Sequence, residues 1–166
     1  DDKLSFELSA YGKNFIIDPG PYRYVLNSWR SYAVSTQAHS TVMIDGFGQN
    51  RLYFSTEYEA PQNPTPVWQS NDLYDYTMAS YDCGYGIDSI PVIHKRHIFF
   101  KKKEYWILLD ELVGEGRHRM ESLFHFGPEF DLKRRDNLSV YTQQGTGPNC
   151  AIIPAHTPGL EVSIIK

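Results

Sequence analysis

The most constraining feature of this sequence is a series of short apolar runs in its second half, each closed by turn-forming residues. Val92–Phe100 is followed by the charged turn Lys101–Glu104; Tyr105–Val113 then returns, and Gly114–Gly116 leads into Arg119–Phe126. Apolar runs of this length, bounded by glycine or charged turns, are typical of antiparallel strands joined by hairpins. This region is therefore predicted to be a β-meander.

The rest of the chain shows the same kind of pattern. A hairpin is expected near the start, where Leu4, Phe6 and Leu8 alternate with polar residues and Phe15–Ile17 supplies the return strand. Further short strands are expected at Thr41–Gly46, Arg51–Phe54, Tyr74–Tyr81, Leu138–Thr142, Cys150–Ile153 and Leu160–Ile165, with a surface loop over 60–69. No convincing helical period occurs, so the prediction is an all-β fold, an antiparallel β-sandwich, as one domain over 1–166 that is truncated at both ends.

Composition narrows the classes of function. The 166 residues are 41% hydrophobic, which is enough for a single core. The formal net charge of -4 gives no indication of the basic surface that nucleic-acid binding requires. No apolar run approaches the roughly 20 residues of a membrane-spanning helix. Cys83 and Cys150 form no C-x-x-C pair, so a zinc ribbon is excluded, while one disulfide and two free thiols both stay open.

Asp18 and His39 are the sharpest pair of candidate metal ligands. Asp18 ends an apolar strand, where a carboxylate is costly unless it is hydrogen-bonded, paired or bound to a cation. A zinc site takes imidazole and carboxylate donors, usually three or more from the protein, so one ligand is lacking. The plainer alternatives are a turn-forming aspartate and a packed histidine. His94 and His97, at odd spacing in one strand, are expected on opposite faces and cannot share a metal.

Four clusters of basic residues could together bind an anionic polymer. They are Lys95–His97, Lys101–Lys103, Arg117–Arg119 and Lys133–Arg135. Their most economical interpretation is as solvated hairpin tips, where charge is least costly. No nucleophile elbow and no glycine-rich loop before a helix is present, so triad hydrolases and phosphate-cradling enzymes are not supported.

Two segments carry a family resemblance. Leu4–Gly12 followed by Ile17–Gly20, and then Thr36–Gly46, resemble the C-terminal β-sandwich of heparinase II/III-type polysaccharide lyases, as does Leu123–Glu129 later in the chain. The resemblance covers most of the chain and rests on the order and spacing of these segments.

The resemblance implies a two-part enzyme with an N-terminal helical toroid, absent from this sequence, packed on the sandwich. It also implies a metal, commonly zinc, held by Asp18, His39 and a histidine just upstream of Asp1. The family reaction is β-elimination at a uronic acid: a base removes the C5 proton while the 4-linked oxygen leaves. Most of the catalytic groups would come from the toroid.

The resemblance leads to three candidate substrate-binding residues and a function. Tyr24 and Tyr32 lie where some relatives use a tyrosine, and Arg30 beside them suits a carboxylate or sulfate, although an arginine lying over Trp29 or Tyr32 is an equal alternative. The parent protein is expected to be a periplasmic or secreted bacterial lyase of an acidic polysaccharide, and this chain alone is expected to be inactive. The alternative is a non-catalytic sandwich that binds carbohydrate or scaffolds a partner domain.

Overall fold

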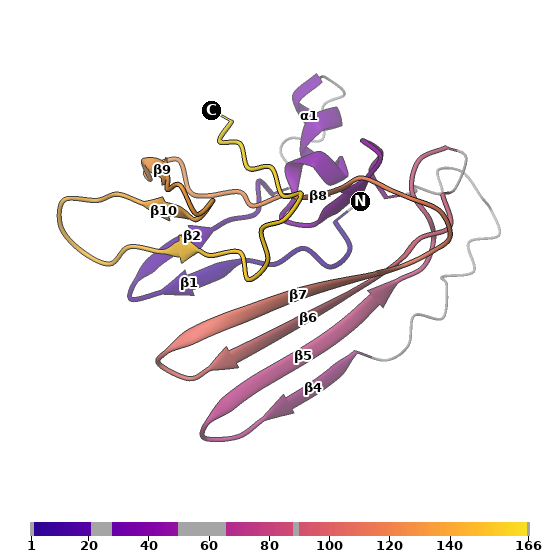
Figure 1. The fold of residues 1–166 in the computed structure, drawn as a ribbon. Coiled ribbons are helices and arrows are strands. Elements are labelled where there is room, and N and C mark those ends of the chain that lie inside the picture. Colours follow the sequence, from indigo (N-terminus) through magenta and orange to yellow (C-terminus); the bar gives the residue numbers. More distant parts are fainter. Residues whose placement is uncertain (1, 21–27, 50–65, 88–89, 166) are drawn as a thin grey trace. The chain divides into compact units, whose positions relative to one another are not determined.

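The regular secondary structure of the described residues consists almost entirely of antiparallel strands (Figure 1). The computed structural model describes residues 2–20, 28–49, 66–87 and 90–165. The predicted all-β fold, an antiparallel β-sandwich, is confirmed. The described residues divide into two compact units, the first of 1–6 and 18–124 and the second of 7–17 and 125–166. A single domain over 1–166 stays a prediction.

The first unit contains a four-stranded sheet in the order β4-β5-β6-β7. Its strands are β4 (Val67–Ser70), β5 (Tyr74–Tyr81), β6 (Ile93–Lys101) and β7 (Tyr105–Val113). The meander predicted from the apolar runs is therefore present. Strand β4 corrects the end of the loop predicted over 60–69, because Val67–Ser70 pair in regular register with β5. Residues 60–65 of that loop lie outside the described residues.

A two-stranded layer completes the core of this unit. Strand β3 (Val42–Ile44) pairs with β8 (Met120–Ser122), and its two fully buried side chains, Val42 and Ile44, cluster with Tyr81, Tyr85 and Val92. Alternate residues of a strand point to opposite faces, so Val42 and Ile44 point to the same side and the less buried Met43 to the other. The segments around β3 are thereby fixed beside the four-stranded sheet.

Two short helices precede β3. They are α1 (Ser28–Ala33) and the 3-10 turn η1 (Thr36–Ala38). The sequence prediction that no helix is present is wrong here, because six residues complete fewer than two turns and leave no readable period. None of the helices in the described ranges is long and apolar enough to cross a membrane.

The second unit contains two small sheets. One is the hairpin of β1 (Leu8–Ala10) and β2 (Lys13–Ile16), and the other has the order β11-β10-β9. The three strands of the latter are β9 (Leu132–Arg134), β10 (Val140–Thr142) and β11 (Ala151–Ile152). Phe15 of β2 is buried and stacks on Phe130, with ring centroids 5.0 Å apart.

Several predicted strands are shorter than expected or absent. The first hairpin begins at Leu8, because Leu4 has φ +62° and the Ser5 N–H donates to the Asp2 carbonyl in a turn. The strand predicted over Arg119–Phe126 is limited to β8. Leu160–Ile165 forms no strand with any described residue, and the strand predicted at Arg51–Phe54 lies outside the described residues.

Candidate metal site and its supporting network

Asp18 and His39 are in direct contact. The Nδ1 atom of His39 lies 2.7 Å from Oδ2 of Asp18, a hydrogen bond in which the ring N–H donates to the carboxylate. The other carboxylate oxygen of Asp18 accepts the Gly20 N–H at 2.8 Å. Asp18 therefore also has the turn-forming role that was its plainer alternative, while His39, at 5% exposure, is packed into the fold.

The segment that carries His39 is tightly built. His39 caps η1, its N–H donating to the Thr36 carbonyl at 3.1 Å, and the Gln49 N–H donates to the Thr36 hydroxyl at 2.9 Å. A Cβ placed on Gly48 would lie 2.8 Å from that hydroxyl oxygen, closer than real Cβ contacts allow. Glycine at position 48 is what lets the two segments approach so closely.

The first residues of the chain are fastened beside this segment. The Lys3 backbone N–H donates to the Gln49 side-chain oxygen at 2.8 Å, and the Lys3 carbonyl accepts both the Gln49 amide at 2.7 Å and the Thr41 hydroxyl at 2.9 Å. Lys3 and Thr41 are 38 residues apart in sequence. These bonds hold the chain entering at Lys3 next to the strand that follows His39.

A buried arginine bridges the same two segments. One terminal nitrogen of Arg96, Nη1, donates to the Leu4 carbonyl at 2.7 Å and to the Ser40 carbonyl at 2.6 Å, and Ser40 directly follows His39. The Nε and Nη2 atoms of Arg96 form a two-point contact with the Asp110 carboxylate, at 2.7 and 2.9 Å. Arg96 is 3% exposed. The predicted assignment of Lys95–His97 to a solvated hairpin tip is therefore wrong, because these residues lie within β6.

Asp110 is the acceptor on which the network depends. Besides Arg96 it accepts Nε2–H of His94 at 2.8 Å and the Ser122 hydroxyl at 3.2 Å. Burial alone would raise the pKa of Asp110, but the hydrogen bonds from His94 and Arg96 and the arginine charge outweigh it and hold that pKa well below its usual range. Asp110 is therefore a carboxylate at neutral pH.

Sequence reasoning did not find this network. Arg96 and Asp110 face each other across β6 and β7, in the register that also pairs His94 with Leu112. A usable signal was present, because Arg96 stands two residues after His94 and strand alternation puts both on one face. His97 lies on the other face, where its ring bonds the Tyr76 hydroxyl at 2.9 Å, as the odd spacing predicts.

The three predicted substrate-binding residues are only partly testable. Tyr24 lies outside the described residues. Arg30 and Tyr32 both lie on α1, and Tyr32 is exposed. Two residues apart on a helix, their side chains do not face each other, so they would not grip one ligand group together from the helix alone. Their role in substrate binding stays a prediction.

Two cysteines and one further histidine have perturbed pKa values. Cys83 and Cys150 form no disulfide with each other, and burial raises the pKa of each thiol. His118 donates through Nδ1 to Asp45 at 2.7 Å and through Nε2 to the Glu115 carbonyl at 2.8 Å. The bond to Asp45 is the main cause of the raised pKa of His118.

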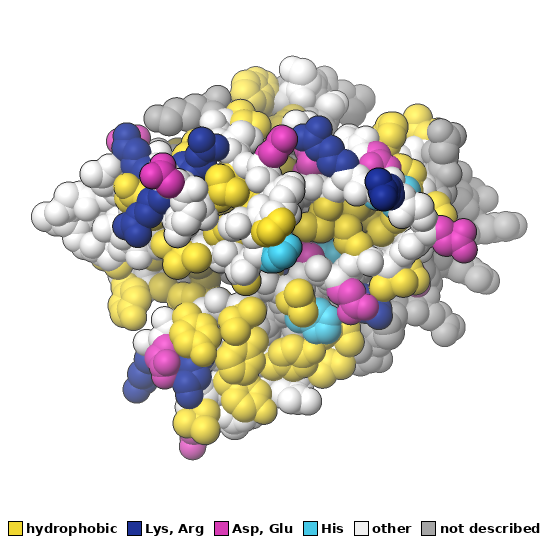
Figure 2. Space-filling model, in the orientation of Figure 1, with side chains coloured by type: hydrophobic (Ala, Val, Ile, Leu, Met, Phe, Trp, Pro, Cys, Tyr) yellow, Lys and Arg dark blue, Asp and Glu magenta, His cyan; other side chains and the backbone are white. Residues whose placement is uncertain are grey.

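A broad apolar surface covers part of the four-stranded sheet. Figure 2 shows hydrophobic side chains gathered over β4–β7, in the lower part of the view. Along β7, Tyr105, Ile107 and Leu109 are exposed, Leu109 to 56%. Within the described residues, β7 is also the last strand of its sheet, with β6 as its neighbour on one side.

The donor chemistry of Asp18 and His39 suits zinc, but two donors do not complete a site. Among the described residues, no group of three His, Cys, Asp or Glu side chains is gathered where a metal could bind. Two ligands on one tetrahedral zinc are about 3.3 Å apart, judging from bond lengths of about 2.0–2.2 Å. The hydrogen bond at 2.7 Å is shorter, so joint coordination would require the two atoms to separate by roughly 0.6 Å.

Comparison with known proteins places the chain. The family model described as "Heparinase II/III-like, C-terminal" matches residues 1–165. A curated relative, the heparin-sulfate lyase of Bacteroides stercoris, is 24% identical over 152 residues, which cover 89% of this chain and 21% of that protein. This chain thus spans about a fifth of the length of the relative. No solved structure matches. Because the family model covers nearly every residue, the chain belongs to the heparinase II/III-like C-terminal domain family.

Proposed function

We propose that the protein carrying this chain is a polysaccharide lyase that cleaves uronic-acid-containing acidic polysaccharide, of the glycosaminoglycan or alginate type, by β-elimination. The family membership supports this, and the matched relative is named a heparin-sulfate lyase. The observation that carries the proposal to individual residues is the 2.7 Å contact between Asp18 and His39, a carboxylate and an imidazole of the kind that zinc binds.

The proposed reaction breaks two bonds and forms one double bond. A base removes the proton from C5 of the uronic acid, the bond between C4 and the glycosidic oxygen breaks, and a C4–C5 double bond forms while that oxygen is protonated. The C5 proton is acidic enough only when the neighbouring carboxylate is neutralised. We assign neither the base nor the acid to this chain, and we expect an N-terminal helical toroid of the same protein to supply most of them.

Within this proposal, the chain contributes a fixed edge of the site. Asp18 and His39 would hold a zinc ion together with a third ligand from just before Asp1, and zinc would supply positive charge near the reacting sugar. The anchoring of Lys3 and Leu4 beside Ser40 and Thr41 supports this arrangement, since it holds the entering chain close to the segment of His39. The supporting role of Arg96 is to keep both segments in place.

An activity assay with three polysaccharides tests the proposed function. The full-length protein is incubated with heparan sulfate, chondroitin sulfate and alginate, and the unsaturated uronate product is followed by its ultraviolet absorbance. Product from at least one of them is the expected result. Silence on all three would favour the alternative, a sandwich that binds carbohydrate or supports a partner domain without catalysis. The 166-residue chain alone is expected to yield no product.

The proposal also places the protein outside the cytoplasm. A lyase of a large extracellular polysaccharide meets its substrate in the periplasm or in the medium, so we propose a periplasmic or secreted bacterial protein. Fractionation of the native host, with the protein detected by antibody, tests this. A protein found only in the cytoplasmic fraction would contradict it.

A further inference from the structure

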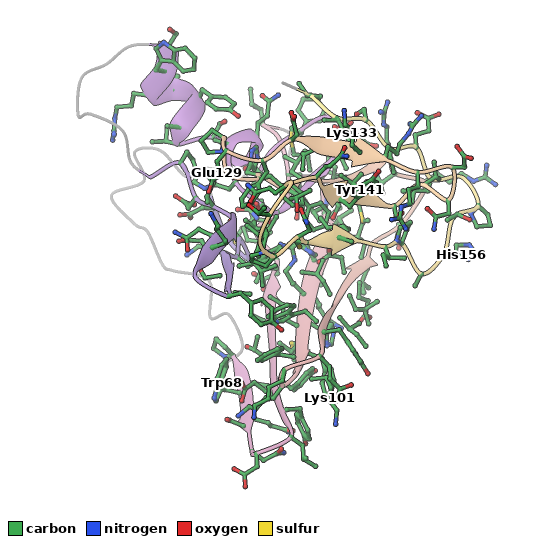
Figure 3. The ribbon with its side chains drawn as sticks, turned by 90° about the vertical axis from the view of Figure 1, so that its left-hand side faces the viewer. Trp68, Lys101, Glu129, Lys133, Tyr141 and His156 are labelled. Atoms are coloured by element: carbon green, nitrogen blue, oxygen red, sulfur yellow. The ribbon has the colours of Figure 1, made fainter. Side chains whose placement is uncertain are left out.

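The outer face of the β9–β10–β11 sheet combines unpaired positive charge with an aromatic ring. Lys133 of β9 stands directly opposite Tyr141 of β10, which in turn stands opposite Ala151 of β11. The ladder continues beyond β9, because the Arg135 N–H donates to the Ser139 carbonyl at 2.9 Å. Lys133 and Arg135, two residues apart in extended chain, therefore share the face of Tyr141. Figure 3 labels Lys133 and Tyr141 on these neighbouring strands.

The arrangement corrects the sequence interpretation of this cluster. Lys133–Arg135 was expected to be a solvated hairpin tip, yet Lys133 and Arg134 lie within β9 and point to alternate faces. Arg134 donates to the Val162 carbonyl at 2.6 Å. The guanidinium of Arg135 instead lies over the Tyr141 ring, 4.7 Å from its centroid, in a cation–π contact.

Several basic side chains of the four-stranded sheet have carboxylate partners, whereas none is found for Lys133 or Arg135 among the described residues. In the four-stranded sheet, Lys95 pairs with Glu111 at 3.5 Å and Lys102 with Asp75 at 3.1 Å. Neither Lys133 nor Arg135 forms an ion pair with any described residue. Asp131, two residues before Lys133, is engaged in an interaction of its own. Two cations therefore stay available for an anion on a chain whose formal net charge is -4.

We propose that Lys133, Arg135 and Tyr141 form a second, non-catalytic contact surface for a strand of acidic polysaccharide. The sugar ring would pack its C–H face on the side of the Tyr141 ring that the Arg135 guanidinium does not cover. The guanidinium of Arg135 suits a carboxylate or sulfate because its planar fork matches two oxygens, and Lys133 adds a point charge. Ala151, which stands opposite Tyr141 on the other neighbouring strand, carries only a methyl group. The class of ligand is taken from the proposed function.

The test measures equilibrium binding of the full-length protein to end-immobilised heparin and alginate chains over a range of salt concentrations. Lys133→Gln/Arg135→Gln should weaken binding about tenfold and lower the slope of log affinity against log salt by about 2, one for each lost contact. The control, Lys95→Gln/Lys103→Gln, removes the same charge elsewhere and should change neither quantity. Tyr141→Phe should keep the affinity because it keeps the ring, and Tyr141→Ala should lose it.

Several results would overturn the inference. These are unchanged binding by Lys133→Gln/Arg135→Gln, an equal loss in the charge-matched control, wild-type affinity in Tyr141→Ala, or equal affinity for single-stranded DNA. The two glutamine substitutions are at exposed positions and should fold, so the result does not depend on the tyrosine variant alone. The two proposals can fail independently. If the protein binds polysaccharide but releases no unsaturated product, only the lyase proposal is refuted. If it cleaves polysaccharide and Lys133→Gln/Arg135→Gln binds as tightly as the wild type, only the contact surface is refuted.

Discussion

Replacing Asp110 by asparagine should be among the most damaging single substitutions in this chain. The Asp110 side chain is 5% exposed and accepts hydrogen bonds from His94, from Ser122 and twice from Arg96. An asparagine of the same shape keeps one acceptor oxygen but turns an N–H2 group toward donors. Arg96 would then be a buried cation without an opposite charge, held by the carbonyls of Leu4 and Ser40 and by at most one amide oxygen.

The size of the effect follows from that burial. Removing one partner of a buried ion pair costs about 3–5 kcal/mol, because the other charge stays in the interior uncompensated. In a chain of this length each kcal/mol lowers the melting temperature by about 2–4 °C, so a decrease of roughly 6–20 °C is expected. The measurement is urea unfolding of the 166-residue chain, followed by tryptophan fluorescence, with the melting temperature as a second readout.

The neighbouring residue supplies a matched control. Glu111→Gln removes the same charge from the next position of β7, but Glu111 is 48% exposed and its bond to Lys95 is 3.5 Å. Exposed pairs of this kind are worth about 1 kcal/mol or less. The reasoning would be refuted if Asp110→Asn cost no more than Glu111→Gln. It would be refuted as well if Arg96→Met/Asp110→Asn, which removes both charges, were as unstable as the sum of its single substitutions.

The same carboxylate gives a pH signature. The pKa of Asp110 is depressed in the folded chain, so the stability it contributes is present above the ordinary aspartate pKa of about 3.9 and is lost as the pH falls through the folded pKa. The gap in unfolding free energy between the wild type and Asp110→Asn should therefore be full at pH 6 and should narrow below about pH 4. A gap that is constant from pH 6 to pH 3 would contradict the charge-based explanation.

Three further predictions concern other parts of the chain. Asp18→Ala in the full-length protein should lower zinc affinity by at least tenfold, as measured by competition with a coloured chelator, while Asp45→Ala should leave it unchanged; equal affinities in the two variants would remove Asp18 from the metal site. The ion pair of His118 with Asp45 should contribute its full stability below about pH 6.5 and lose it as the pH rises through the raised folded pKa of His118. Amide exchange at the end of β3 should therefore quicken over that pH range by more than the intrinsic increase of exchange with pH. His118→Asn should abolish this excess. Gly48→Ala should destabilise the fold by about 1–3 kcal/mol in urea unfolding, because its Cβ would lie 2.8 Å from a hydroxyl oxygen, whereas Gly145→Ala, with nothing within 4 Å of its Cβ, should be neutral.

The sequence predicted most of the strands because their signals are local. Tyr74–Tyr81 is rich in β-forming residues and coincides with strand β5. The charged residues of Lys101–Glu104 correctly indicated a turn between β6 and β7. Strand β4 and helix α1 were missed because they are short, four and six residues long, so that no period can be read in them. The strand expected at Leu160–Ile165 shows the reverse failure, since an apolar pattern that finds no partner strand among the described residues forms no ladder.

In the candidate site, too, some residues could be predicted from local sequence and others could not. Asp18 and His39 were singled out by residue type and position and then by the resemblance, and they do meet in space, 21 residues apart in sequence, while their metal stays a prediction. Arg96 was misassigned because its burial is decided by the Leu4 and Ser40 carbonyls, 92 and 56 residues away. A cluster of basic letters cannot show which member finds such partners, because that depends on strand register rather than composition.

The outer margin of β7 has a practical consequence for handling this domain. Within the described residues, alternate residues of the nine in β7 direct their backbone N–H and C=O groups to the side away from β6, with tyrosine, isoleucine and leucine side chains beside them. An extended segment of another molecule that pairs with β7 would form backbone hydrogen bonds and bury apolar side chains at the same time. Concentrated solutions of the excised domain should therefore self-associate through this margin, and a lysine placed at Ile107 or Leu109 would be the simplest way to keep the molecules apart.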